Sequence, residues 1–216
     1  MVRILIADDH AIIRESLRSL LSRRPDWQIC GEATNGREAV SAAKQSRPDI
    51  VILDLSMPDL NGLEATLQIR KALPSTEILI FTMHHPEDRV RQIIAAGARG
   101  YLIKSDAVAH LEAAIEALAQ HKPYFTSKVT QIMLDTVRAA TGRSGVAIFG
   151  AEPLTARERE IVQLLAEGKS NKQISGLLGL TVATVQTHRT TIMHKLGVSS
   201  VAELVRYAVR NKIIEA

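Results

Sequence analysis

The fold is decided by the stretch Ile50-Val51-Ile52-Leu53-Asp54, in which four consecutive apolar residues are followed by an acid. A strand that is apolar at every position is typical of a parallel sheet with helices on both faces. Four more short strand-like runs occur before residue 104, and helical patterns alternate with them. The sequence therefore predicts an α/β domain with a doubly wound, five-stranded parallel sheet.

The expected elements alternate strictly along this part of the chain. Strands are predicted at 3–7, 28–33, 50–55, 77–83 and 100–103, and helices at 12–21, 36–45, 62–72, 86–96 and 107–120. In such a sheet, functional groups gather at the carboxyl ends of the strands. These ends are therefore the first place to look for a site.

The end of the chain follows a different pattern, which is helical throughout. Thr155 and Ser170 each have capping-box spacing, and Gly168 and Gly179 would stop the helices that follow them. Thr181 can cap a third helix that ends at Lys195, and a fourth is expected at 201–212. Two short helices, a tight turn and a longer helix predict a four-helix, all-α helix-turn-helix domain. We expect domains at 1–122 and 153–216, joined by a linker at 123–152 with a helical segment at 128–140.

Length and charge agree with this division. A chain of 216 residues suits two domains. Its net charge of +4 is uneven, because residues 153–216 carry 9 basic against 5 acidic side chains, whereas residues 1–122 carry 15 against 16. A small basic module favours a polyanion partner, and with only 3% aromatic residues a base-stacking, single-strand mode is disfavoured. No apolar stretch approaches the roughly 20 residues that span a bilayer, so cytoplasmic residence without membrane contact is expected.

Acidic and polar residues lie at the ends of the predicted strands. Asp8 and Asp9 end the first strand and Asp54 ends the third, and these two strands are neighbours in a doubly wound sheet. Three converging carboxylates need a cation, and hard oxygen ligands of this kind suit Mg²⁺. Thr82 and Lys104 bring a hydroxyl and an ammonium to the same rim. The set predicts a phosphoryl site, although each acid by itself could equally be a helix or turn cap.

The chemistry assigns a role to each group. Asp54 would act as the nucleophile that accepts a phosphoryl group, while Lys104 and the metal offset charge on the transferring oxygens. Thr82 would hydrogen-bond the acyl phosphate. Tyr101 is either plain core or a switch whose ring moves inward when Thr82 is drawn toward the phosphate.

The first domain resembles the receiver of two-component systems over residues 1–122. The resemblance is carried by Asp8-Asp9-His10, Asp54-Leu55-Ser56-Met57-Pro58-Asp59-Leu60-Asn61-Gly62, Thr82, Tyr101 and Lys104. It implies a flavodoxin-like sheet of strand order 2-1-3-4-5 and a sensor histidine kinase as phosphoryl donor. It also implies that Asp9, Asp54 and the backbone carbonyl of Ser56 bind Mg²⁺ directly, and that Asp8 holds it mainly through water.

Residues 153–216 resemble the LuxR-type helix-turn-helix of NarL/FixJ response regulators. The matching segments are Leu154–Glu160, Gly168–Ile174, Thr184–Arg189 and Ile192–Gly197. The third helix is expected to bury Val182, Val185, Ile192 and Leu196, and to present Gln186, Thr187, Arg189 and Thr190 to the major groove of duplex DNA. Lys172, His188, Arg189 and Lys195 are expected at phosphates.

One position departs from the LuxR-type pattern, where a lysine is common in place of Gln186. A glutamine can pair bidentately with adenine, whereas a lysine donates to guanine or neutralises a phosphate. A Gln186 that simply faces solvent is the alternative left open.

The resulting hypothesis is a transcriptional regulator, not an enzyme, that binds promoter repeats as a homodimer when phosphorylated or on DNA. RNA polymerase is a further candidate partner. Three alternatives remain: a metal-dependent phosphatase, a phosphorylation-independent DNA-binding protein, and a LuxR regulator that senses a small molecule. The last is disfavoured by the phosphoryl site in the N-terminal half, and the first by the lack of an obvious substrate-binding cap.

Overall fold

The computed structural model describes residues 1–83, 89–127, 129–132, 134 and 154–215. They form two compact units, a sheet with helices and a group of helices. None of the described helices is long and apolar enough to cross a membrane.

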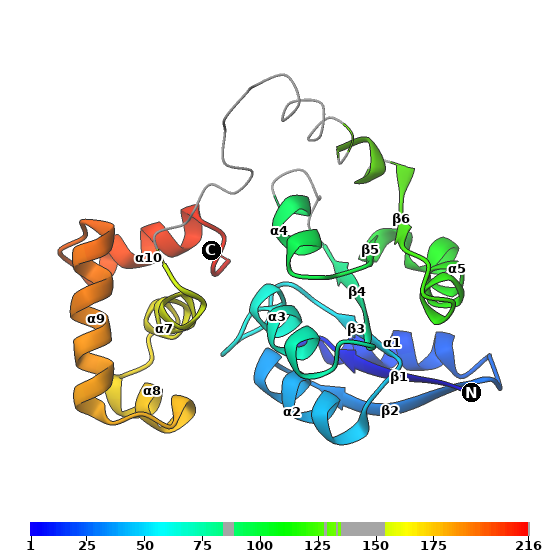
Figure 1. The fold of residues 1–216 in the computed structure, drawn as a ribbon, viewed down its shortest axis with the longest axis horizontal. Helices are drawn as coiled ribbons and strands as arrows, with labels where there is room; N and C mark the ends of the chain where they lie inside the picture. Colours follow the sequence, from blue (N-terminus) through cyan, green and yellow to red (C-terminus); the bar gives the residue numbers. More distant parts are fainter. Residues whose placement is uncertain (84–88, 128, 133, 135–153, 216) are drawn as a thin grey trace. The chain divides into compact units, whose positions relative to one another are not determined.

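The first unit is built on one parallel sheet (Figure 1). Its strands are β1 (Val2–Ala7), β2 (Trp27–Ala33), β3 (Ile50–Leu53), β4 (Glu77–Thr82), β5 (Gly100–Ile103) and β6 (Tyr124–Phe125). The order is β2-β1-β3-β4-β5-β6, so the predicted strands and their order are confirmed. The short β6 adds a sixth strand, in which Tyr124 and Phe125, expected in the linker, pair with Gly100 and Tyr101.

The helices of this unit are α1 (Ala11–Leu21), α2 (Gly36–Ser46), α3 (Gly62–Ala72), α4 (Val90–Ala95) and α5 (Ala107–Ala119). Buried residues of α1 and α5 form one core cluster with alternate residues of β1, β3, β4 and β5. On the other face, α2 and α3 lie side by side (Figure 1). Strand residues are therefore buried from both sides, as the continuous apolar run at Ile50–Leu53 predicts. Residues 86–88 of the expected fourth helix lie outside the described residues.

The second unit contains α7 (Ala156–Ala166), α8 (Asn171–Leu178), α9 (Val182–Leu196) and α10 (Val201–Arg210). The expected capping boxes form at Thr155 and Ser170, which accept hydrogen bonds from the backbone N–H groups of Glu158 and Gln173. Gly179 ends α8 with a left-handed φ of 63°, a conformation that favours glycine. The tight turn between α8 and α9 follows from it.

The core of this unit lies where α7, α8, α9 and α10 meet. Val185 and Ile192 of α9 are fully buried, and Leu196 packs against the cluster. The expectation for Val182 is wrong, because its residue is 48% exposed. It is the first residue of α9 and follows an exposed turn, so its spacing from Val185 alone does not bring it into the core.

The predicted linker is described only in part. Residues 129–132 and 134 are helical, and the rest of the expected helix at 128–140 lies outside the described residues.

Candidate functional sites

The pairing of β1 with β3 brings the strand-end acids together. Ala7 aligns with Leu53, so Asp8 and Asp54 both come directly after paired residues, and the Asp54 N–H donates to Ala7 O at 2.9 Å. Asp8 is fully buried and Asp54 is 3% exposed, whereas Asp9 is exposed. Asp8, Asp9, His10 and Asp54 each offer a ligand atom, and these atoms lie within 4.8 Å of one another.

Lys104 connects the two buried carboxylates. Its Nζ lies 2.7 Å from Asp8 Oδ2 and 2.9 Å from Asp54 Oδ2, and its side chain is only 5% exposed. Burial raises the pKa of Asp54, and the Asp8 carboxylate adds to this, against the lowering effect of Lys104. Burial by itself lowers the pKa of Lys104, but the charges of Asp54 and Asp8 outweigh it and raise the pKa. The ammonium is therefore held charged beside the candidate nucleophile.

The cluster contains three carboxylates, of which Lys104 contacts those of Asp8 and Asp54. Carboxylate oxygens grouped within 4.8 Å of one another are the kind of donor that a hard divalent cation prefers. The residues present therefore fit Mg²⁺, with oxygen ligands available from Asp8, Asp9 and Asp54.

Thr82 and Tyr101 lie on neighbouring strands and on the same face of the sheet. Thr82 aligns with Ile103, which is two residues after Tyr101, and side chains two apart on a strand point the same way. Thr82 is fully buried and Tyr101 is 1% exposed, so the ring already points inward. Burial raises the pKa of Tyr101, so its phenol stays protonated.

The loop after β3 folds back tightly onto the end of that strand. The Gly62 N–H donates to Leu55 O at 2.9 Å, and a Cβ atom at Gly62 would lie 2.0 Å from the backbone oxygen of Asp54. Only glycine fits this close approach. The loop that contains Ser56 is thereby held beside the acidic cluster.

Two residues next to the acidic cluster, His10 and Arg14, were not predicted to have a role in the site. The His10 N–H donates to Asp8 Oδ1 at 2.9 Å, and its ring Nδ1 lies 2.7 Å from Asp9 Oδ1. Arg14 donates to the backbone oxygen of Asp8 at 2.9 Å. The position of His10 beside the aspartates could have suggested the first contact, but nothing in the sequence marks Arg14, which lies one turn into α1.

The second candidate site is the exposed side of α9. Gln186, Thr187 and Thr190 are exposed, while His188 and Arg189 are half-buried. The hydroxyls of both threonines donate to carbonyls of α9 itself, Thr187 to Ala183 O and Thr190 to Gln186 O, each at 3.1 Å. Gln186 is the longest of the three exposed side chains and accepts a hydrogen bond from Asn171 of α8.

Two expected phosphate contacts differ in their surroundings. Lys172 is exposed on the first turn of α8. Lys195 Nζ, by contrast, lies 2.5 Å from Glu158 Oε1, the carboxylate that also completes the capping box of α7. The hydrogen bond from Lys195 lowers the pKa of Glu158. Lys195 therefore links α9 to the start of α7 within the unit.

Comparison with known families assigns both units. The family described as "Response regulator receiver domain" matches residues 4–116, and "Bacterial regulatory proteins, luxR family" matches residues 152–208. The transcriptional regulatory protein LiaR of Bacillus subtilis is 39% identical over 214 residues, which are 99% of this chain and all of LiaR. The chain belongs to the two-component response regulators. The oxygen regulatory protein NreC of Staphylococcus epidermidis is 36% identical over 217 residues, again 99% of this regulator and all of NreC.

Solved structures agree with the fold of this response regulator. A LuxR-family two-component response regulator from Aurantimonas sp. SI85-9A1 is 38% identical with a TM-score of 0.60, over 63% of this chain and 99% of that one. RcsB from Salmonella enterica, solved bound to promoter rprA with the phosphomimetic BeF3-, is 25% identical with a TM-score of 0.59, over 95% and 97% of the two chains. The regulator thus combines a receiver domain with a LuxR-type DNA-binding domain.

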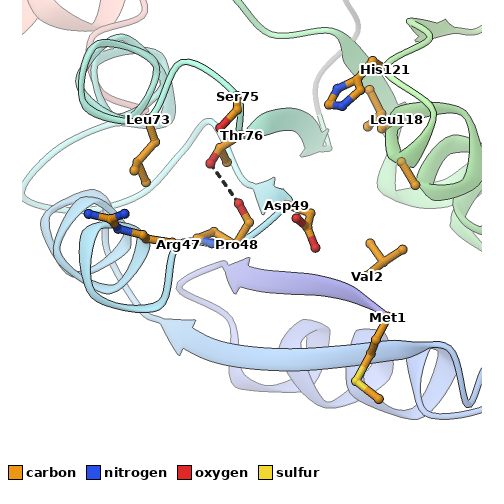
Figure 2. Close-up of a pocket in the computed structure, with 11 residues that line it drawn as sticks. Met1, Val2, Arg47, Pro48, Asp49, Leu73, Ser75, Thr76, Leu118 and His121 are labelled. Carbon is orange, nitrogen blue, oxygen red and sulfur yellow. Dashed lines mark hydrogen bonds between the residues drawn. The ribbon is translucent and has the colours of Figure 1, made fainter.

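A pocket of about 480 Å³ lies at the amino ends of the receiver strands, near the start of β1 and away from the acidic cluster (Figure 2). The Thr76 hydroxyl donates to Pro48 O at 2.8 Å along its wall. Figure 2 shows the charged or titratable side chains Arg47, Asp49 and His121 on different sides of the pocket. They do not converge on one point, so the acidic cluster remains the candidate for phosphoryl chemistry.

Proposed function

We propose that Asp54 accepts a phosphoryl group from a phosphohistidine of a sensor histidine kinase, and that this modification controls DNA binding by residues 153–216. The observation that carries the proposal is Lys104, whose ammonium lies 2.9 Å from the buried Asp54 carboxylate and 2.7 Å from Asp8. We further propose receiver, linker and DNA-binding segments at 1–122, 123–152 and 153–216.

The chemistry follows from the charges around Asp54. A carboxylate oxygen of Asp54 forms a bond to phosphorus as the phosphorus–nitrogen bond of the donor breaks, and the imidazole leaves with the electron pair. Lys104 offsets negative charge on the phosphoryl oxygens. Asp9, Asp54 and the carbonyl of Ser56 would hold Mg²⁺ directly, and Asp8 through water. Bound Mg²⁺ supplies further positive charge to the transferring oxygens.

The proposed switch uses the pair on β4 and β5. The Thr82 hydroxyl hydrogen-bonds the acyl phosphate, and the buried Tyr101 ring on the same face of the sheet responds to the position of Thr82. Phosphorylation shifts a pre-existing equilibrium between two arrangements of these side chains.

The proposed DNA interface is centred on α9. Gln186, Thr187, Arg189 and Thr190 would face base edges in the major groove, and Lys172, His188, Arg189 and Lys195 would meet phosphates. The promoter complex of RcsB, solved with a phosphomimetic, supports duplex DNA as partner. Two copies on repeated half-sites would place two α9 helices one DNA turn apart, so we propose a homodimer on DNA. RNA polymerase is a further proposed partner.

The proposal is tested with the full chain and a small phosphoryl donor. Wild type incubated with acetyl phosphate and Mg²⁺ should gain the mass of one phosphoryl group and bind a selected promoter duplex more tightly in fluorescence anisotropy. Asp54→Asn should show neither change. The matched control is Asp49→Asn, which changes an exposed acid just before β3, at the opposite end of that strand from Asp54. This variant should behave as wild type.

The two parts of the proposal can fail separately. A phosphoryl group on Asp54→Asn would show that another residue is the acceptor. Phosphorylated wild type that binds DNA no more tightly than the unmodified protein would show that the receiver does not control the DNA-binding domain. Turnover of a phosphorylated metabolite that survives removal of residues 153–216 would favour a phosphatase.

A further inference from the structure

A side-chain hydrogen bond links the two helices of the helix-turn-helix. Asn171, the first residue of α8, donates from Nδ2 to Oε1 of Gln186 on α9 at 2.6 Å. The two residues are 15 positions apart, so the bond depends on how α8 packs against α9. Gln186 is exposed and lies in the N-terminal half of α9. The bond therefore holds a side chain on the surface proposed to face the bases.

The remaining amide atoms show which end of Gln186 is available. Nδ2 is the end of the Asn171 amide that meets Gln186, while Oδ1 of Asn171 is enclosed and makes no hydrogen bond with the described residues. The Gln186 Oε1 atom is engaged by that donor. Among the described residues, Nε2 of Gln186 makes no hydrogen bond, which leaves two N–H donors on its outer end.

We propose that Asn171 is a positioning residue for base recognition, which holds the amide of Gln186 with Nε2 turned toward the DNA so that this position of α9 prefers guanine. This inference rests on the proposed function, in which α9 enters the major groove. Guanine presents two neighbouring acceptors there, O6 and N7, which match the two N–H donors of Nε2. Adenine presents N7 beside an N6 amino donor, so a bidentate contact with adenine needs Oε1 as well as Nε2 at the base edge, whereas Asn171 holds Oε1 toward α8.

The bond also orders Gln186 before DNA arrives. A glutamine side chain loses rotamer freedom when it is fixed against a base, and a side chain that is already held loses less. Because Asn171 also fixes which end of the Gln186 amide faces the base, its loss should change discrimination between bases and not only overall affinity. A residue that only contacts phosphate affects all sequences alike. A change in base preference therefore distinguishes a positioning role of Asn171 from a phosphate contact, which would change only overall affinity.

The test uses the full-length, phosphorylated protein and randomised duplex DNA. Sites are selected with wild type and with Gln186→Ala, and the base pair whose preference disappears in Gln186→Ala identifies the position that Gln186 reads. Affinities for the four variants of that base pair are then measured by fluorescence anisotropy. Wild type should prefer guanine there, and Asn171→Ala should lose about tenfold of that preference, the usual size of one base contact.

Two further variants sharpen the result. Asn171→Asp carries only acceptors, so it should bond Nε2 of Gln186, turn Oε1 outward and shift the preference toward a base with an amino donor, cytosine or adenine. An acid at the first turn of a helix is favourable, so this variant should fold. Lys172→Ala changes the exposed neighbour of Asn171 and should weaken binding to all four duplexes alike. Circular dichroism checks that each variant keeps its helices.

Several outcomes overturn the inference. Asn171→Ala with the wild-type base preference would show that Gln186 needs no positioning. An equal effect of Asn171→Ala in the Gln186→Ala background would show that Asn171 acts on the DNA by itself. Selection of adenine by wild type would refute the proposed orientation. If wild type selects no sequence at all, the proposed function has failed, which is a different result from a loss confined to the Asn171 variants.

Discussion

Replacement of Lys104 by methionine tests the electrostatics of the acidic cluster directly. The change removes the ammonium that lies 2.7 Å from Asp8 and 2.9 Å from Asp54, in a place where the lysine side chain is 5% exposed. At such burial solvent screens the contact only weakly. Removing one partner of a buried ion pair costs about 3–5 kcal/mol because the other charge is left unpaired.

The lower part of this range is expected here. Methionine fills most of the space of the lysine stem, so little packing is lost. The Asp54 carboxyl, whose pKa is already raised, can relieve some of the repulsion by taking up a proton. We therefore expect the receiver domain to lose about 3 kcal/mol of its free energy of unfolding. With a urea dependence of about 1.5 kcal/mol per molar, the midpoint should fall by about 2 M.

The single tryptophan makes the measurement specific to the receiver domain. Trp27 is 8% exposed and belongs to the core cluster of the sheet, so its fluorescence follows unfolding of that domain in the full chain. Urea titrations in EDTA compare wild type with Lys104→Met. The control is Lys44→Met on the exposed side of α2, which should shift the free energy by less than about 0.5 kcal/mol.

Mg²⁺ and a double variant identify the cause. An ion present at about a hundred times its Kd stabilises the folded state by about 2.7 kcal/mol. Because the carboxylates are unpaired in Lys104→Met, Mg²⁺ should stabilise this variant more than wild type. Adding Asp54→Asn should also restore stability, since it removes one unpaired charge. A Lys104→Met midpoint equal to that of wild type in EDTA would refute this account of the cluster.

Three further predictions concern other parts of the chain. Gly62→Ala should destabilise the receiver by about 1–3 kcal/mol in urea titrations and slow phosphorylation by acetyl phosphate, because its Cβ would lie 2.0 Å from the backbone oxygen of the phosphoacceptor. Ile192→Ala should cost the DNA-binding domain about 2–5 kcal/mol by circular dichroism, whereas Val182→Ala at a residue that is 48% exposed should change little. Lys195 lowers the pKa of Glu158, so the stability that this carboxylate contributes is present above its usual pKa of 4.5 and is lost as the pH falls through the lowered pKa. Glu158→Gln should therefore lose less stability than wild type on acidification. A pH profile of stability equal to that of wild type would contradict this role.

The receiver fold was predictable because its strands and helices can be recognised from short, local stretches of the sequence. Continuous apolar runs such as Ile50–Leu53 predict buried parallel strands, and the topology of a doubly wound sheet then makes β1 and β3 neighbours. The carboxylates of Asp8 and Asp54 meet for that reason, whatever the details of their loops. The two-residue strand at Tyr124–Phe125 has no such signal, because it is recognisable only by its pairing with β5.

The DNA-binding domain shows where this reasoning stops. Capping boxes at Thr155 and Ser170 are local, so sequence spacing predicts them well. The partner of Gln186 is not local, because it depends on the angle and register at which α8 crosses α9. A glutamine on an exposed helical face suggested a bidentate contact with adenine, for which both ends of the amide must face the base. The bond from Asn171 instead holds Oε1 toward α8. The base that this position prefers is therefore a property of the packed helix pair, and variants of Asn171, rather than of Gln186 alone, test that dependence.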